Sequence, residues 1–145
     1  LLRFLRRPLR VCGMVRNEGQ PGGGPFFVQK NGETRKQIVE KAQLANTDKV
    51  NVLLMQSTHF NPVMMALDFK DFQGEAYDLS AFTEEEAYFI VEKSHQGKSI
   101  RFIEQPGLWN GGMANWNTLF VEIPNEVFTP VKTVLDLLQN THQSI

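Results

Sequence analysis

The chain has 145 residues, enough for one domain with a hydrophobic core of its own. With 41% hydrophobic and 21% charged residues it has the composition of a soluble globular protein, and a formal net charge of −1 gives it no overall field toward nucleic acid or membrane. No apolar run approaches the ~20 residues that a transmembrane helix needs. We therefore expect neither a nucleic-acid nor a membrane partner.

The cysteine content and the first residues predict the compartment and the domain organisation. Cys12 is the only cysteine, so no internal disulfide can form; this fits a reducing compartment and predicts a cytoplasmic location. The sequence starts at Leu1 rather than at a methionine, so we expect the native protein to extend upstream. Residues 1–8, which are rich in arginine, are expected to be a basic tail or a remnant of that upstream half. Residues 9–145 are expected to form a single domain.

Glycine and proline divide the first half of the chain into short elements. Residues 9–15 and 26–29 have the apolar character of strands, and Asn-Gly at residues 31–32 predicts a turn after the second. The glycines and prolines of residues 17–25 exclude both helix and strand pairing there. The segment 36–44 is ambiguous, and a strand is favoured.

Three capping signals predict helices. Thr47 is expected to cap a helix that runs to residue 56, and Thr83, before three glutamates, to cap a second. Pro130 is expected to open a third helix that ends at Leu138. The remaining segments predict strands over residues 63–69, 99–104 and 118–123 and a loop over residues 105–117. Strands mixed with short helices predict an α/β protein with a mixed sheet.

Three consecutive glycines form the first candidate site. Gly22, Gly23 and Gly24 lie between two expected strands, and without Cβ atoms their backbone N–H groups can approach a phosphate or a sugar hydroxyl closely. Composition alone favours a tight strand connection without a ligand, because a lone glycine run is weak evidence.

The segment Thr-His-Phe-Asn-Pro at residues 58–62 is the second candidate. The amide of Asn61 can donate to and accept from a polar ligand, although an Asx-type turn explains it at least as well. His59 has the chemistry of a general base, but the sequence shows no partner acid, so a structural histidine is favoured. The other two histidines and Cys12 are far away in sequence, so no metal-ligand cluster is expected.

The loop of residues 106–118 is the third candidate, because it holds both tryptophans of the chain and three asparagines. The flat face of Trp109 suits the C–H face of a sugar ring, and the amides of Asn110 and Asn117 can reach neighbouring hydroxyls. This combination is typical of a carbohydrate pocket. A loop that its tryptophans pack onto the core is supported equally well.

The fourth candidate is Lys132, in the first turn of the last expected helix. The helix dipole disfavours a cation at that end, so a lysine there indicates an anion that both the helix and the ammonium attract. A solvated surface lysine remains a common alternative.

Together these segments resemble the bacterial family named domain of unknown function 4301. Its members are longer, and the chain is similar to their C-terminal portion. The resemblance rests on several runs in the same order: Arg-Val-Cys-Gly-Met-Val-Arg-Asn-Glu-Gly-Gln-Pro-Gly-Gly-Gly-Pro-Phe (10–26), Gln-Ile-Val-Glu-Lys-Ala-Gln (37–43), residues 58–62, residues 106–118 and residues 128–138.

More distantly, the chain resembles uridylyltransferases that act on glucose 1-phosphate and their N-acetylhexosamine relatives. Those enzymes carry a Gly-Gly turn, a strand with Glu and Ala-Gln, an Asn segment, and Phe-x-Pro-Val-Lys before Asp-Leu-Leu. The resemblance implies that Lys132 contacts phosphate as the catalytic residue. The sugar contacts would come from the glycine turn together with Glu40 and Asn61. It also implies the C-terminal half of a nucleotide-diphospho-sugar transferase-like, Rossmann-like fold.

The implied activity joins a nucleoside triphosphate to a sugar 1-phosphate and releases pyrophosphate, with Mg²⁺ expected in the full-length protein. The nucleotide-binding loop of those enzymes is not in this chain, so the chain alone is expected to be inactive. Its expected partners are a sugar phosphate or nucleotide sugar, the missing N-terminal half, and a second copy. Two residues depart from the family pattern, Gln20 and Met64, where acids are more usual. A non-catalytic sugar-binding module and a structural fragment are the alternatives.

Overall fold

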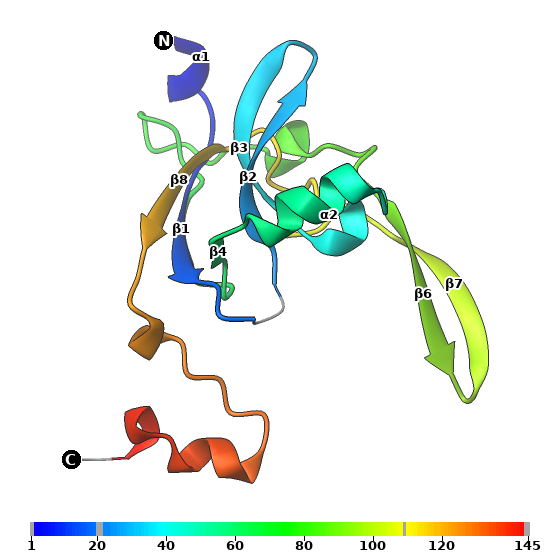
Figure 1. Cartoon of the computed structure of the whole chain (residues 1–145). Helices are drawn as coiled ribbons and strands as arrows, with labels where there is room; N and C mark the ends of the chain where they lie inside the picture. The colour runs from blue at the N-terminus through cyan, green and yellow to red at the C-terminus, as the bar shows by residue number, and fades with distance from the viewer. Residues whose placement is uncertain (1, 20–21, 109, 144–145) are drawn as a thin grey trace.

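The computed structural model describes residues 2–19, 22–108 and 110–143. They form a mixed α/β arrangement of small sheets with one helix of eight residues and several short 3-10 turns (Figure 1). The expected fold class is confirmed at that level. The strands are β1 (Leu9–Arg16), β2 (Gly24–Lys30), β3 (Glu33–Val39), β4 (His59–Phe60), β5 (Met65–Asp68), β6 (Phe89–His95), β7 (Lys98–Glu104) and β8 (Asn117–Glu122).

Strand β1 is the centre of the largest sheet. It pairs in parallel with β8 along one edge, from Leu9 opposite Asn117 to Met14 opposite Glu122. Along its other edge it pairs antiparallel with β5 and then with β4. A strand hydrogen-bonded on both edges suits an apolar sequence, and β1 is buried from Cys12 to Val15.

A four-residue interruption, residues 61–64, separates β4 from β5 along the same edge of β1. Val63 has a φ of 64°, a left-handed conformation that is costly for a β-branched residue. The side chain of Asn61 closes the turn by accepting a hydrogen bond from the Val63 N–H at 2.8 Å. The strand expected over residues 63–69 therefore begins only at Met65.

The chain also forms two antiparallel hairpins, β2–β3 and β6–β7. The Asn31-Gly32 turn joins β2 to β3 with φ values of 51° and 77°, which confirms the turn expected from the Asn-Gly pair. Only the first part of the segment 36–44 is a strand, because β3 ends at Val39 and the 3-10 helix η1 (Lys41–Gln43) follows.

Helix α2 (Asp48–Met55) confirms the helix expected after Thr47, whose hydroxyl accepts a hydrogen bond from the Val50 N–H at 3.4 Å. A single-turn helix α1 (Leu2–Leu5) precedes β1. The part of the chain that the structure describes has no helix of the length and apolarity needed to cross a membrane.

The helix expected after Thr83 is wrong. A 3-10 helix, η2 (Leu79–Phe82), comes before Thr83, and turns follow it. Two of the three glutamates interact with other parts of the chain. The Glu84 N–H donates to the carbonyl of Gly111, and the carboxylates of Glu84 and Glu86 lie 2.8 and 3.9 Å from the ammonium of Lys30. The acids that would stabilise a helix start therefore hold the β2–β3 hairpin against this loop.

The α-helix expected from Pro130 to Leu138 is also wrong. The structure has a 3-10 helix, η4 (Val134–Leu138), whose N-cap is Thr133, and 3-10 helices η3 (Asn125–Val127) and η5 (Asn140–His142) flank it. The carboxylate of Asp136 accepts from the N–H groups of Lys132 and Thr133 at 2.9 and 2.7 Å. This capping sets the start of the helix after Lys132 rather than before it.

The core is small and lies between β1 and β3. Cys12, Met14 and Ile38 are its buried members, and Met65 and Phe120 pack against them. Burial raises the pKa of the Cys12 thiol, while neighbouring Arg10 opposes that shift. A cluster of this size leaves many large apolar side chains exposed, Leu2, Phe27, Met55, Phe72 and Val134 among them.

Candidate functional site

A polar cavity of about 460 Å³ lies between the end of β1 and the C-terminal segment. We call it the Lys132 cavity. One wall comes from β1 and the loop after it, and the other from η3, η4, η5 and the extended segment between them. Its lining residues are Val15, Glu18, Asn125, Glu126, Phe128, Thr129, Pro130, Lys132, Asp136, Gln139, Asn140 and Thr141.

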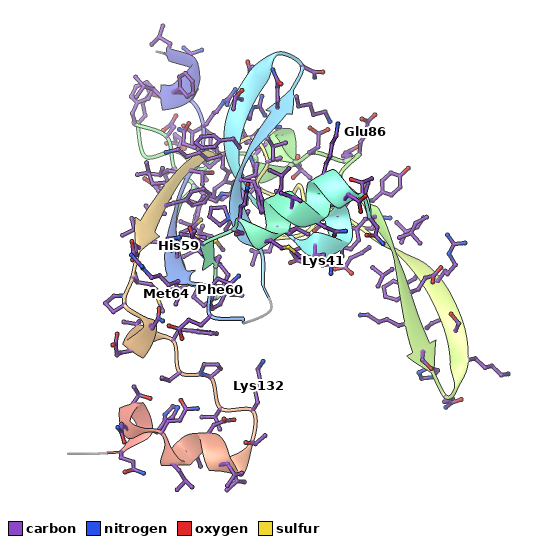
Figure 2. The ribbon with its side chains drawn as sticks, viewed as in Figure 1. Lys41, His59, Phe60, Met64, Glu86 and Lys132 are labelled. Carbon is purple, nitrogen blue, oxygen red and sulfur yellow. The ribbon has the colours of Figure 1, made fainter. Side chains whose placement is uncertain are left out.

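A hydrogen bond of its backbone N–H fixes the main chain of Lys132 at this cavity. Its N–H donates to Oδ2 of Asp136, which also accepts from the N–H and the hydroxyl of Thr133. The backbone hydrogen bonds from Thr133 and then Lys132 lower the pKa of Asp136. Among the described residues, no carboxylate forms an ion pair with the Lys132 ammonium. Figure 2 shows its side chain pointing from the extended segment toward the body of the molecule.

The charges around the cavity are mostly negative. Glu18, Glu126 and Asp136 line it together with the single ammonium of Lys132. Glu18 accepts from the amide of Asn125 at 2.8 Å, and Asp136 is engaged by backbone N–H groups. A phosphate dianion therefore needs more positive charge than this chain alone supplies. The described residues form no group of three or more His, Cys, Asp or Glu that could hold a metal ion.

Two aromatic side chains, Phe60 and Phe128, lie between the glycine turn and the Lys132 cavity. A Cβ on Gly22 would lie 3.0 Å from the ring of Phe60. That ring packs edge-on against Phe128, with centroids 5.2 Å apart, and Phe128 lines the cavity. The structure therefore places the turn and the lysine at the same end of the molecule, although the glycines themselves do not line the cavity.

Packing accounts for two of the three glycines. A Cβ on Gly23 would lie 2.5 Å from Cγ2 of Ile38, and one on Gly24 would lie 2.6 Å from Oγ of Ser57. Both glycines are buried, so the backbone there approaches β3 and the segment before β4 more closely than any side chain allows.

Glu40 lies beside the glycine turn, at the end of β3. Its Cγ would be 3.5 Å from a Cβ on Gly23, so the structure brings together these two residues, both of which were expected to line the sugar. Glu40 also takes part in the capping box of η1, where its N–H donates to Oε1 of Gln43 at 2.7 Å. It is half-buried.

The side-chain amides of the three asparagines that were expected to bind the sugar form hydrogen bonds with backbone groups. Asn61 donates to the carbonyl of Gly13 at 2.7 Å and is 3% exposed. Asn110 accepts from the Gly107 N–H at 2.7 Å, and Asn117 donates to the carbonyl of Phe4 at 2.7 Å. Each amide therefore stabilises a turn or strand end in this structure, and a ligand contact would have to replace one of these bonds. Trp109 and Gln20 lie outside the described residues.

His59 has the acidic neighbour that could not be seen in the sequence. Its Nε2 lies 3.6 Å from Oε2 of Glu122, and its Nδ1 lies 2.8 Å from the hydroxyl of Thr58. Arg16 also contacts Glu122 at 3.1 Å and is the main reason that the pKa of Glu122 is lowered. Strand β1 lies between β4 and β8, which explains how residues so distant in sequence meet.

A second cavity, of about 440 Å³, lies between the β2–β3 hairpin, α2 and the loop that carries Glu84. Apolar side chains such as Phe26, Val39 and Leu53 line most of it. Its charged groups are paired: Lys30 lies 2.8 Å from Glu84 and 3.9 Å from Glu86, which Figure 2 labels. This apolar groove was not expected, because the segments that form it are brought together only by the tertiary fold.

The architecture is that of a mixed α/β protein, and the charged residues that line its Lys132 cavity are one lysine and three acids. The family model described as Domain of unknown function (DUF4301) matches residues 1–143, so the chain belongs to that family. This confirms the family resemblance drawn from the runs at residues 10–26 and 37–43. A search of curated proteins found no match to the chain.

Proposed function

We propose that this chain supplies the phosphate-binding half-site of a sugar-1-phosphate nucleotidyltransferase-like protein. The proposal rests on one observation above all. Lys132 carries an ammonium without an ion-pair partner among the described residues, at a polar cavity where Asp136 fixes its backbone. An unpaired cation beside a concave polar site is suited to bind an anion.

The lysine would act by neutralising phosphate charge. A lysine ammonium is a compact point charge with three donors, and Thr129, Asn140 and Thr141 place further hydroxyl and amide groups around it. In the proposed reaction an oxygen of the sugar phosphate attacks the α-phosphorus of a nucleoside triphosphate, and pyrophosphate leaves. Such transfers depend on positioning and electrostatic stabilisation rather than on a protein nucleophile.

The glycine turn and Glu40 support the sugar side of the proposal. They are neighbours, and Phe60 and Phe128 connect the turn to the cavity. A carboxylate beside a turn without Cβ atoms is able to accept from sugar hydroxyls that approach the backbone closely. The finer assignment, the C-terminal half of a Rossmann-like nucleotide-diphospho-sugar transferase fold, is part of this proposal. The parallel pairing of β1 with β8 supports it.

The acidic lining leads us to expect a requirement for additional cations in the full-length protein. Three carboxylates and one lysine surround the cavity, so a phosphate dianion gains little from entering alone. The described residues do not form a metal site of their own. Mg²⁺ would therefore have to enter with the phosphates, as it does when it keeps few protein ligands.

A phosphate titration tests the proposal on the chain itself. Glucose 1-phosphate and inorganic phosphate are titrated to millimolar concentrations, with and without Mg²⁺, while backbone amide resonances are followed by NMR. We expect shifts at Thr129, Lys132 and Asn140 when Mg²⁺ is present, and about tenfold weaker binding in Lys132→Ala. Lys70→Ala, which removes an exposed lysine elsewhere, is the matched control and should bind as the unmodified chain does. Equal binding by both variants would contradict the proposal.

A structural, non-catalytic role is the second candidate. The observation in its favour is that the amides of Asn61, Asn110 and Asn117 all bond to backbone groups. Activity of the full-length protein separates the two functions. The transferase proposal predicts that Lys132→Ala lowers the specific activity with little change in melting temperature, because the lysine side chain is exposed. The structural role predicts that no transfer activity is found.

A further inference from the structure

The β6–β7 hairpin stands away from the rest of the molecule (Figure 1). Its two-residue turn, Gln96-Gly97, has φ values of 50° and 76°, the geometry that matches the twist of a tight hairpin. Among the described residues, neither of its strands pairs with another strand. A two-stranded hairpin is marginally stable in water on its own, so this one is suited to gain a third strand from a partner.

The hairpin also carries exposed apolar side chains. On β7, Ile100 is 43% exposed, Phe102 is 37% exposed and Ile103 is 55% exposed. Ile100 and Phe102 lie on one face of the hairpin, opposite Lys93 and Val91 of β6. Side chains of this kind on an unpaired strand are typical of an edge that accepts another strand.

The turn determines which backbone groups of β7 face outward. In a two-residue hairpin the residues that flank the turn, here His95 and Lys98, form a hydrogen-bonded pair, and hydrogen-bonded pairs then alternate along the ladder. The inward backbone groups of β7 therefore belong to Lys98, Ile100, Phe102 and Glu104. Its free outward groups belong to Ser99, Arg101 and Ile103.

We propose that β7 pairs antiparallel with β7 of a second copy of this chain, with the two-fold axis at Arg101. This register pairs outward residues only with outward residues, as the hydrogen-bond ladder requires. The two hairpins then form one four-stranded sheet. Across the new contact, Lys98 lies opposite Glu104 of the second copy, Ile100 opposite Phe102, Ser99 opposite Ile103, and Arg101 opposite Arg101.

The sequence of β7 is complementary to itself in this register. Opposite charges meet at both ends of the contact, through Lys98 and Glu104, which have no ion-pair partner among the described residues. Between them, Ile100 packs against Phe102 on the same face, so each copy covers these two exposed apolar side chains of the other. At the axis, each Arg101 is compensated by Glu92 of its own hairpin, whose carboxylate lies 3.1 Å away.

Other pairings lack this complementarity. Moving the axis to Ile100 places Lys98 opposite Phe102, and moving it to Phe102 places Ile100 opposite Glu104. The other edge of the hairpin also lacks it, because a two-fold axis at Glu92 of β6 places Val91 opposite Lys93 and brings no residues of opposite charge together.

Charge reversal tests the register. Lys98→Glu and Glu104→Lys each place like charges opposite one another, and we expect each to raise the dimer Kd about tenfold in analytical ultracentrifugation. The double variant, with both substitutions, should restore dimerisation. Within one hairpin, Lys98 lies opposite His95 and Glu104 lies opposite Phe89, so the two residues do not pair with each other. If each single substitution acted only by destabilising the hairpin, the double variant would not restore dimerisation. A chain that stays monomeric, or a dimer that neither reversal weakens, overturns the proposal.

A cysteine at the axis gives an independent test. Two residues in a hydrogen-bonded antiparallel pair have Cα atoms about 5.5 Å apart, a separation that a disulfide spans. Arg101→Cys should therefore form a covalent dimer on mild oxidation. The matched control is Glu92→Cys on β6, which should not, and Cys12 does not interfere because it is buried. Equal cross-linking of the two variants overturns the proposed axis.

Discussion

The guanidinium of Arg10 donates to Oε1 of Gln37 at 2.7 Å, across 27 residues of sequence. This bond joins the sheet around β1 to the β2–β3 hairpin. The network continues on both sides: Nε of Arg10 donates to the hydroxyl of Thr118 at 2.9 Å, and Nε2 of Gln37 donates to the carbonyl of Ala114 at 2.7 Å. Arg10 is 1% exposed, and burial lowers its pKa. A polar network thus takes the place that apolar packing has in a larger core.

Removing Gln37 should destabilise the fold strongly. Gln37→Leu leaves the buried guanidinium without one acceptor, so we expect a loss of about 2 kcal/mol in the free energy of unfolding by urea denaturation. Gln29→Leu on the exposed part of β2 is the control and should change it by less than about 0.5 kcal/mol. Arg10→Met added to Gln37→Leu should recover part of the loss, since no buried charge remains. A fully additive double variant would argue against the network.

Asn61 should prove more important for stability than for binding. Asn61→Ala removes the acceptor for the Val63 N–H and the donor to the carbonyl of Gly13, so we expect a loss of about 2 kcal/mol. Thermal unfolding measures it, and Asn46→Ala, in an exposed loop, is the comparison. An Asn61→Ala chain of unchanged stability that binds sugar phosphate poorly would instead establish the ligand contact.

The left-handed Val63 should be replaceable with a gain. Glycine adopts a φ of 64° freely, whereas valine is strained there, so Val63→Gly should raise the free energy of unfolding by up to about 1 kcal/mol. The same substitution at Val28, in the middle of β2, should lower it. If Val63→Gly also destabilises, the contacts of the valine outweigh its backbone strain.

The pH dependence of the Lys132 segment follows from Asp136. Hydrogen bonds from Thr133 and Lys132 lower its pKa below the ordinary value of 3.8, so the capping interaction is fully present above that pH and is lost as the pH falls through the lowered pKa. We expect the amide resonances of Lys132 and Thr133 to move together on acidification. In Asp136→Ala they should already lie at their released positions at neutral pH.

Local signals in the sequence predicted the parts of the fold that depend on neighbouring residues. The structure confirms three such predictions: the strand over residues 9–15, the Asn31-Gly32 turn and the cap at Thr47. The helix after Thr83 was wrong because Lys30, distant in sequence, binds Glu84. The sequence around Glu84 is the same whether Glu84 starts a helix or binds Lys30. Only the position of the β2–β3 hairpin decides between these two outcomes.

The candidate site shows the same division. Lys132 was predicted as a candidate from its sequence context, and in the structure it lines a cavity, but its position outside the helix depends on how Asp136 caps the segment. The neighbourhood of Gly23 and Glu40 was expected only through the resemblance to uridylyltransferases. The contact between His59 and Glu122 could not be predicted from the sequence, because it needs the strand order around β1.

A crystal structure of the chain grown with a sugar 1-phosphate tests the central claim most directly. The account predicts phosphate oxygens within hydrogen-bond distance, about 3 Å, of the Lys132 ammonium, with the sugar toward the Gly23 backbone and Glu40. A phosphate bound elsewhere, with the Lys132 side chain extended into solvent, would contradict it.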